Sequence, residues 1–244
     1  MTGHRPGRLK NTDMEALVLA GGFGTRLQAV LPEVPKPMAP IGGKPFLEFL
    51  LGYLTRFPIT HFILCTGYKH DIIEKHFGTA FKDVPITYSV EKEPLGTGGA
   101  IVQAIPLVHE QNCVILNGDT FFEIDIERFF RNHVLSNSDF SIALKTMKFF
   151  DRYGTVKRVG DRIVAFEEKC FHAAGEINGG VYVVKKSVFS KHSLTKSFSL
   201  EKDFLEKNVV NNTITGFVYD GFFIDIGLPE DYARAQTELA ERQL

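Results

Sequence analysis

The sequence lacks the features of a membrane protein, a nucleic-acid-binding protein or a secreted protein. No apolar run approaches the length of a membrane span. The 28 Lys and Arg residues are matched by 29 Asp and Glu residues, so there is no basic excess for nucleic acid and any phosphate recognition must be local. The three cysteines, Cys65, Cys113 and Cys170, show neither metal-site spacing nor a disulfide framework. A reducing cytoplasm therefore fits best.

The first 13 residues are polar and basic, without the apolar core of a signal peptide. We expect residues 1–13 to form a flexible tail and the folded part to start near Met14. The remaining length suits a single domain, residues 14–244, with an ample core. Within it we expect two parts, residues 14–139 and residues 140–235.

What the sequence does contain is an apolar run that ends in glycines and is followed by two cations. Residues 17–20 are predicted to form a short buried strand. The glycines at 21, 22 and 24 would let the backbone turn tightly and approach a ligand. Their N–H groups, together with Arg26 and Lys36, would form a cationic pocket suited to phosphates. The alternative is that these glycines form a plain connector between a strand and a helix and bind no ligand. The two cations on the same segment favour the phosphate pocket over this alternative.

Several known signatures are absent. There is no P-loop, and the run Gly22-Phe23-Gly24 lacks the third glycine of the dinucleotide fingerprint. There is no Gly-x-Ser-x-Gly, and the eight histidines form no obvious pair. The lack of a nucleophile–base pair is consistent with phosphoryl or nucleotidyl transfer, in which the attacking group is already an anion and the enzyme supplies positioning and charge neutralisation.

Strand and helix patterns alternate through the first half of the chain. This indicates an α/β fold with a Rossmann-like, mostly parallel mixed sheet flanked by helices. The predicted strands are 15–20, 62–66, 86–90 and 113–116, and the predicted helices are 45–56, 71–77, 98–105 and 126–132. Such sheets bind ligands outside the carboxyl ends of their strands. The segments after residues 20, 90 and 116 should therefore meet at one edge.

The second half has strand patterns joined by short turns, which indicates a smaller, more antiparallel lobe. The predicted strands are 140–148, 155–159, 163–168, 180–185, 214–219 and 222–226, and the predicted helices are 200–209 and 230–243. Gly160-Asp161 is predicted to turn between two of these strands.

Two acids stand at the ends of predicted strands. Asp119 follows the run 113–116, and Asp225 interrupts an apolar strand. Each acid could instead form a turn or cap a helix, but together in a chain with a phosphate loop they favour Mg²⁺, which prefers a few carboxylates plus phosphate oxygens and water. Asp125 and Asp231 are weaker candidates, because both sit near predicted helix starts where acids act as caps.

Polar residues in the second half could bind a sugar phosphate. Lys169 could neutralise a phosphate, Glu168 and Asn178 could bond sugar hydroxyls, and Gly179 and Gly180 would let the backbone approach a ring. The alternatives are a solvated hairpin edge around Glu168 and a hairpin turn at Asn178.

Taken together, these motifs resemble the sugar-1-phosphate nucleotidylyltransferase family, with its nucleotide-diphospho-sugar transferase type of fold. The resemblance covers residues 14–232, nearly the whole chain, and its parts occur in the family's order. They are the loop 21–27, Pro35-Lys36-Pro37, residues 93–99, Gly118-Asp119, Glu168-Lys169, residues 178–180 and Asp225.

The resemblance implies roles for individual residues. Arg26 and Lys36 would be catalytic, and Asp119 and Asp225 would hold Mg²⁺. The nucleotide would be bound by Leu19, Ala20, Gly21, Gly22, Gly24, Thr25, Arg26, Lys36, Glu91, Pro94, Leu95, Gly96, Thr97, Gly118 and Asp119. The sugar phosphate would be bound by Gly154, Glu168, Lys169, Asn178 and Gly179. The resemblance therefore makes residues 14–139 the nucleotide-binding part and residues 140–235 the smaller, sugar-phosphate-binding part.

The family's reaction is attack of a sugar-1-phosphate oxygen on the α-phosphorus of a nucleoside triphosphate, which releases pyrophosphate. The strings at 91–101, 117–122, 151–156 and 222–232 are similar to the bacterial guanylyltransferases that act on D-glycero-α-D-manno-heptose 1-phosphate. This implies GTP and heptose 1-phosphate as substrates and a role in surface glycan synthesis. Because the chain ends one helix after Asp225, we do not expect the carboxy-terminal β-helix of longer members.

Residue chemistry alone does not select guanine or a seven-carbon sugar. Mannose 1-phosphate with GTP, or a uridylyl, cytidylyl or adenylyl transfer, therefore stays open. A nucleotide-binding regulatory subunit is the alternative outside the enzymes. A homodimer formed through the aromatic-rich second half is a further expectation.

Overall fold

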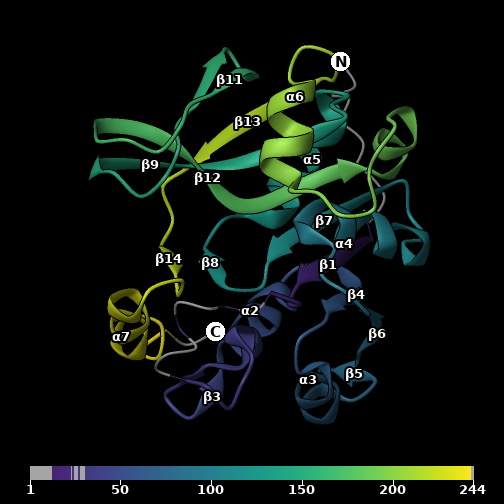
Figure 1. Cartoon of the computed structure of the whole chain (residues 1–244), viewed down its shortest axis with the longest axis vertical. Coiled ribbons are helices and arrows are strands. Elements are labelled where there is room, and N and C mark those ends of the chain that lie inside the picture. The colour runs from purple at the N-terminus through teal and green to yellow at the C-terminus, as the bar shows by residue number, and fades with distance from the viewer. Residues whose placement is uncertain (1–12, 23, 25–26, 28–30, 243–244) are drawn as a thin grey trace, which may run out of the picture.

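The computed structural model describes residues 13–22, 24, 27 and 31–242, and a ten-stranded mixed sheet runs through its centre (Figure 1). The strands in spatial order are β10 (Val156–Val159), β11 (Arg162–Phe166), β13 (Ile214–Tyr219), β9 (Phe140–Phe150), β12 (His172–Lys185), β7 (Asn112–Asn117), β1 (Met14–Leu19), β4 (Ile59–Thr66), β6 (Val84–Val90) and β5 (Ala80–Phe81). The predicted fold class is confirmed. Most of the predicted tail lies outside the described residues.

The strands β7, β1, β4 and β6 form the parallel part of the sheet. Leu19 pairs with Cys65 on one side and with Asn117 on the other, so the ends of β1, β4 and β7 are level with one another. The carboxyl ends of these strands therefore share one edge, as the alternating pattern predicts.

The strands of the second half extend this same sheet. β12 runs antiparallel to both β7 and β9, while β13 runs parallel to β9. β12 begins at His172 rather than at residue 180. Asn178 therefore lies inside a 14-residue strand rather than in a hairpin turn, at a register shift between Asn178 and Tyr182. Gly160 makes the predicted turn between β10 and β11, with a φ of 59°.

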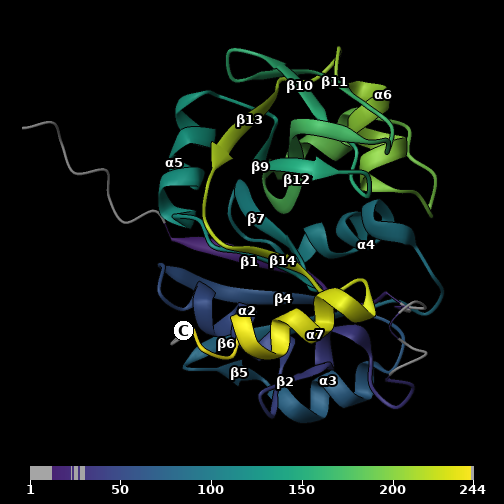
Figure 2. The ribbon, with the colours of Figure 1, turned by 90° about the vertical axis from the view of Figure 1, so that its left-hand side faces the viewer.

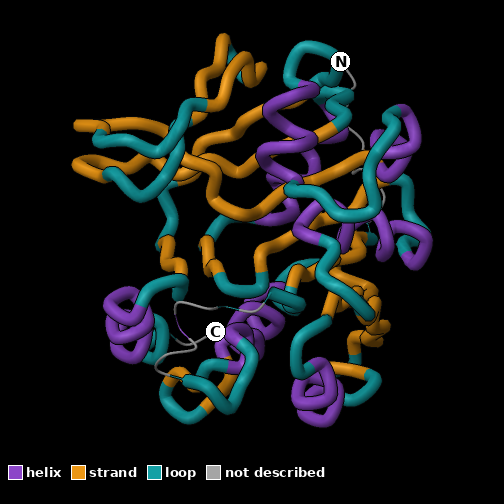
Figure 3. Tube along the Cα trace, viewed as in Figure 1, coloured by secondary structure: helices purple, strands orange, loops and turns teal. Residues whose placement is uncertain are grey.

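Helices cover both faces of the sheet, and the alternation of side chains along β1 shows how. Val18 and its even-numbered neighbours pack into one apolar cluster, with α2 (Phe46–Leu54), α3 (His70–Phe77) and α5 (Ile126–Leu135). Leu17 packs into the other, with α4 (Gly96–Ala104). Figure 2 shows α5 and α4 on opposite sides of the sheet, and Figure 3 shows the same helices in purple around the strands.

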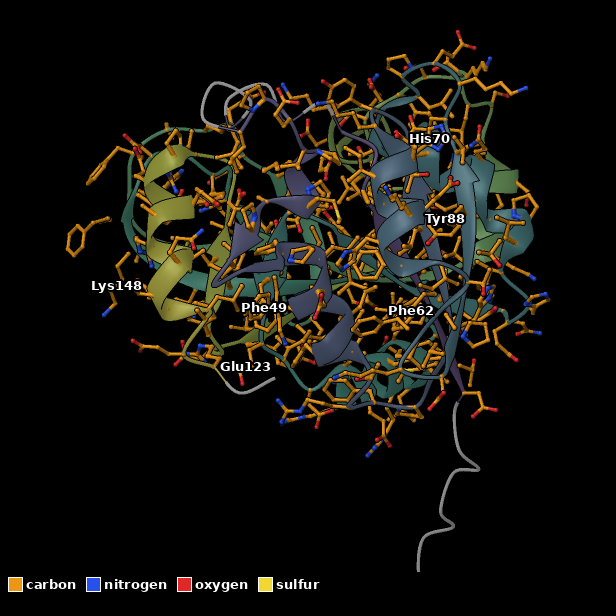
Figure 4. All side chains as sticks on the ribbon, turned by 90° about the horizontal axis from the view of Figure 1, so that it is seen from below. Phe49, Phe62, His70, Tyr88, Glu123 and Lys148 are labelled. Carbon is orange, nitrogen blue, oxygen red and sulfur yellow. The ribbon has the colours of Figure 1, made fainter. Side chains whose placement is uncertain are left out.

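Short-range chemistry explains where several helices begin and end. Asp125 caps α5, its carboxylate accepting a hydrogen bond of 2.8 Å from the Arg128 N–H. Gly78, with a φ of 60°, ends α3. Pro229 stands in the first turn of α7 (Pro229–Glu238). Phe62, labelled in Figure 4, is completely buried beneath α2 and α3.

The remaining elements are short. The predicted helix at 200–209 is a π-helical turn, η4 (Leu200–Leu205), followed by α6 (Glu206–Asn208). Among the described residues there are also three 3₁₀ turns, η1 (Lys36–Met38), η2 (Ile105–Leu107) and η3 (Lys186–Lys191). Two small antiparallel pairs stand apart from the main sheet, β2 (Pro40–Ile41) with β3 (Lys44–Pro45), and β8 (Thr120–Phe122) with β14 (Phe223–Asp225). None of the helices in the described residues combines the length and apolar character needed to cross a bilayer.

Candidate active site

Two adjoining cavities open at the carboxyl edge of the parallel strands. One has a volume of about 530 Å³ and lies beside β1, β4 and the start of α4. The other has a volume of about 380 Å³ and lies over β12 and η4. Asn117, at the end of β7, lines both. We call them the β1 cavity and the β12 cavity.

Most of the residues predicted to bind the nucleotide line the β1 cavity. They are Leu19, Gly21, Gly22, Gly24, Lys36, Glu91, Pro94, Gly96, Thr97 and Asp119. Ala20, Leu95 and Gly118 are buried behind its wall. Thr25 and the predicted catalytic Arg26 lie outside the described residues. The cavity is also lined by Gly67 and Tyr68, which follow β4 and carry no motif in the sequence.

The glycine loop is shaped by close contacts. A Cβ at Gly21 would lie 2.5 Å from Oε1 of Glu91, and a Cβ at Gly24 would lie 2.7 Å from Cβ of Lys36. Gly24 also has a φ of 59°, which L side chains rarely adopt. Glycine at these two positions therefore lets the loop lie directly against Glu91 and Lys36.

Glu91 shapes the opposite wall of the β1 cavity. Its Oε2 accepts a hydrogen bond of 3.0 Å from the Leu95 N–H, which holds the turn that leads into α4. Burial raises the pKa of Glu91, and the hydrogen bond from Leu95 lowers it only in part. The carboxyl thus ties the ends of this turn together at the base of α4.

Three charged groups meet at the junction of the two cavities. Lys36 Nζ lies 2.6 Å from Oδ2 of Asp119 and 3.6 Å from Oδ1 of Asp225. Asp119 lines the β1 cavity and Asp225 lines the β12 cavity. Burial and the nearby charge of Asp119 raise the pKa of Asp225, while Lys36 and the Gly227 N–H lower it. Two carboxylates from distant parts of the chain therefore share one ammonium group.

The small β8–β14 pair brings these acids together. Asp225 pairs with Thr120 across it, and the Ile226 N–H donates a 3.0 Å hydrogen bond to the Asp119 carbonyl. Of the weaker metal candidates, Asp125 caps α5, and Asp231 accepts hydrogen bonds from Arg152 and Arg234. Those two acids have their structural partners within the fold.

Four of the five residues predicted to bind the sugar phosphate line the β12 cavity: Gly154, Glu168, Lys169 and Asn178. Gly179 lies beneath it, where a Cβ would come within 2.4 Å of the Phe122 ring. The sequence suggested a hairpin turn as an alternative for Asn178, and the structure instead places this residue at the irregularity in β12, facing the cavity.

A hydrogen-bonded chain that the sequence analysis missed joins the two cavities. Asn178 Nδ2 donates to the Tyr182 hydroxyl over 2.9 Å, and that hydroxyl donates to Oε1 of Glu201 over 3.2 Å. The other oxygen of Glu201 accepts from the Thr97 hydroxyl, also over 3.2 Å. Glu201 stands beside Lys202 and Asp203 in η4, so nothing in the local pattern distinguishes it. Only the tertiary structure connects it to Thr97.

Asn117 carries a further signal of ligand binding. Its Oδ1 is buried and has no hydrogen-bond partner among the described residues. A buried acceptor without a partner costs free energy. Because Asn117 borders both cavities, a substrate hydroxyl or amide at the junction would supply the missing donor.

Comparison with known proteins gives consistent matches. The family model described as nucleotidyl transferase matches residues 15–242. D-glycero-α-D-manno-heptose 1-phosphate guanylyltransferase of Aneurinibacillus thermoaerophilus is 50% identical over 226 residues, which cover 93% of this chain and 98% of that protein. The protein of the same name from Campylobacter jejuni is 46% identical over 220 residues, covering 90% and 97%. The crystal structure of HddC from Yersinia pseudotuberculosis complexed with GMP-PN matches with a TM-score of 0.83 and 34% identity, covering 93% and 99%.

Proposed function

The chain belongs to the nucleotidyl transferase family, and from this premise we propose that it transfers a guanylyl group from GTP to D-glycero-α-D-manno-heptose 1-phosphate. The products are GDP-heptose and pyrophosphate. The observation that carries the proposal is the meeting of Lys36, Asp119 and Asp225 where the β1 and β12 cavities adjoin. The guanine base and the heptose follow from the similarity to guanylyltransferases of that specificity.

The chemistry requires two anionic substrates to be held in line. A phosphate oxygen of the sugar phosphate attacks the α-phosphorus of GTP, one P–O bond forms, and the bond to the departing pyrophosphate breaks. Two separate cavities with a shared border suit this geometry, because each can hold one substrate with its phosphate at the junction. Holding both reactants in this way removes much of the entropic part of the barrier.

The residues of the chain act by position and charge. We assign the β1 cavity to GTP, with the glycine loop beside the phosphates and the Glu91–Leu95 turn beside the base. Lys36 neutralises phosphate charge at the reacting centre. In the β12 cavity, Lys169 binds the sugar phosphate. Glu168 accepts hydrogen bonds from sugar hydroxyls, and the Asn178 amide donates to them or accepts from them. Preorganised charges of this kind typically contribute about 10²–10³-fold each to the rate.

The acidic pair fits a magnesium ion. Asp119 and Asp225 offer hard oxygen donors, and Mg²⁺ is commonly held by one or two carboxylates together with substrate phosphates. We propose that these two side chains hold it. When bound, Mg²⁺ would neutralise charge on the phosphates during transfer. Lys36 already places a positive charge beside the same two carboxylates, which supports the proposal that a cation binds there.

The proposal is tested with a grid of GTP, ATP, CTP and UTP against heptose 1-phosphates and mannose 1-phosphate, read by pyrophosphate release with and without Mg²⁺. We expect the highest kcat/KM for GTP with D-glycero-α-D-manno-heptose 1-phosphate, and no release without the metal. A different best pair would correct the specificity alone. GTP binding with no pyrophosphate release from any pair would overturn the proposal and indicate a regulatory subunit.

We further propose a cytoplasmic location, a product destined for surface glycans, and a homodimer. Cys65, Cys113 and Cys170 are all free thiols, which agrees with a reducing compartment. Phe149 and Phe171 are 76% and 67% exposed near the paired ends of β9 and β12, and they offer an apolar surface for a second copy. Analytical ultracentrifugation of the full chain and of its Phe149→Ser variant tests the dimer.

A further inference from the structure

A group of three side chains of the types that can ligate a metal lies at the opposite end of β1 from the candidate active site. Glu15, near the start of β1, faces His61 of β4 and His109, which stands between η2 and β7. The glycine loop follows the other end of β1, about 20 Å away along the strand at about 3.3 Å per residue. None of these three residues lines either cavity of the active site.

The donor atoms of the three residues converge. Oε1 of Glu15 lies 3.1 Å from Nδ1 of His61 and 2.9 Å from Nδ1 of His109, and one donor atom from each residue lies within 4.8 Å of both others. Bonds of 2.0–2.1 Å to a central ion at tetrahedral angles place ligand atoms about 3.4 Å apart. Small side-chain adjustments would therefore admit an ion between them.

The second carboxylate oxygen of Glu15 and the second ring nitrogen of His61 also have hydrogen-bond partners. Oε2 of Glu15 accepts hydrogen bonds from the His109 and Glu110 N–H groups, over 2.7 and 2.8 Å. Nε2 of His61 lies 2.8 Å from the Thr87 hydroxyl. In metal sites, hydrogen bonds of this kind to the second oxygen and to the second ring nitrogen orient the ligands.

We propose that Glu15, His61 and His109 form a binding site for a transition-metal ion of the Zn²⁺ type. Two imidazoles and one carboxylate are typical ligands for Zn²⁺, Co²⁺ and Ni²⁺, whereas Mg²⁺ prefers oxygen donors alone. The side chain of His109 is 79% exposed, so an ion has a path of entry and water can complete its coordination. Bound there, the ion would tie β1, β4 and the segment before β7 together.

The protons balance without a further reactant. In the metal-free state the Nδ1–H tautomer of each imidazole donates its proton to Glu15 Oε1. On binding, each Nδ1 gives its lone pair to the ion and the ring proton moves to Nε2. The Nε2 proton of His61 is then donated to the Thr87 hydroxyl, and that of His109 points to solvent.

The charges around the site decide how strongly it would hold a cation. Burial would raise the pKa of Glu15, but the hydrogen bonds from Glu110, His109 and His61 bring it below its ordinary value, so the carboxylate is ionised. The ammonium of Lys186 donates hydrogen bonds to the carbonyl oxygens of Val108 and His109, and its positive charge would repel a cation bound nearby. The buried carboxylate of Glu15 would compensate part of the positive charge of the bound ion.

The test is titration of the full chain with Co²⁺, followed by visible absorption, and with Zn²⁺, followed by calorimetry. Both use the Asp119→Asn, Asp225→Asn double variant as the parent, so that the active-site acids do not contribute. We expect one bound ion per chain and an increase in melting temperature on adding Zn²⁺. His109→Ala, an exposed change, should weaken Zn²⁺ binding by more than about 100-fold and abolish that increase.

His70→Ala is the matched control. His70, labelled on α3 in Figure 4, also faces a carboxylate, with Nδ1 at 3.0 Å from Glu74, but it belongs to no three-residue group among the described residues. This variant should bind Zn²⁺ like the parent. Equal binding by the parent and by His109→Ala would overturn the proposal, as would no binding by the parent. In either case, the three residues are only a hydrogen-bonded anchor for β1.

Discussion

At the residue scale, the reactivity of the site depends on how charges are balanced around one ammonium group. Lys36 faces two carboxylates, so the junction carries a net negative charge of one when all three groups are ionised. That charge attracts a cation and repels substrate phosphates. The proposed divalent ion would reverse the sign of this charge and make the junction attractive to both substrates.

Asp225→Asn should reduce kcat by about 10²–10³-fold or more, because it removes one of the two carboxylates proposed to hold the Mg²⁺ ion that neutralises the reacting phosphates. The melting temperature should not fall, since burial and Asp119 already disfavour the charged form of Asp225. Pyrophosphate release and thermal unfolding measure the two effects. Asp220→Asn is the control, an acid that is 98% exposed five positions earlier. Near-normal turnover in Asp225→Asn would remove this residue from the site.

Lys169→Ala should mainly raise the KM for the sugar phosphate, by about tenfold or more, because a charge-assisted hydrogen bond to a phosphate contributes roughly 1.5–3 kcal/mol. The KM for GTP should stay close to that of the parent. Lys148→Ala, an exposed lysine on β9 labelled in Figure 4, serves as the control. An unchanged KM for the sugar phosphate in Lys169→Ala would contradict its place in the β12 cavity.

At the element scale, the irregularity in β12 decides which side chains face the β12 cavity. The register with β9 shifts between Asn178 and Tyr182, and Gly180 takes a φ of 72° there. A bulge of this kind redirects the side chains on one strand. Asn178 consequently reaches Tyr182, and Gly179 lets Phe122 of β8 pack directly against the strand.

Gly179→Ala should therefore lower the free energy of unfolding by about 1–3 kcal/mol, the usual effect of overpacking a closed interior. Its Cβ would meet the Phe122 ring at 2.4 Å and the Ala143 carbonyl oxygen at 2.8 Å. Urea unfolding measures the loss. Gly22→Ala is the control, because a Cβ there meets none of the described residues within 4 Å. Equal stability of the two variants would show that β12 can move away from β8.

At the scale of the whole molecule, a buried polar network fastens α5 to the sheet. His133 is 1% exposed, with Nδ1 at 2.8 Å from the Ser141 hydroxyl and Nε2 at 3.3 Å from Oδ1 of Asn112. The Ser141 hydroxyl continues the network to Thr215 on β13. Burial lowers the pKa of His133 to about 4 from its ordinary 6.5. The fold therefore requires the neutral imidazole.

This network predicts a loss of stability in mild acid. The unfolded chain binds a proton at His133 near pH 6.5, and the folded chain does so only near pH 4. The contribution of neutral His133 to the free energy of unfolding is therefore complete above pH 6.5. It falls as the pH is lowered towards 4 and is lost below pH 4. The loss amounts to roughly 3 kcal/mol. Urea unfolding between pH 7.5 and 4 measures it, with His133→Gln as the comparison. Identical pH dependence in the two proteins would contradict the assignment.

Much of the β1 cavity could be predicted because its residues are local to strand ends. Leu19, Gly21 and Gly24 follow one strand, Glu91 follows another, and Asp119 follows a third. The parallel arrangement then brings these ends to one edge. The same reasoning could not find β8, which is only three residues long, or the link from Glu201 to Thr97, which joins separate parts of the chain.

The sequence by itself determined the alternation of strands and helices, the parallel centre of the sheet and the residues at its carboxyl edge, since side-chain period and glycine placement act over a few residues. The tertiary structure decided which distant groups meet. It placed Asp225 beside Lys36 through the β8–β14 pair, turned Asn178 into the β12 cavity, and gathered Glu15, His61 and His109 at the far end of β1. Such meetings depend on strand pairing and packing between remote segments, which no local pattern encodes.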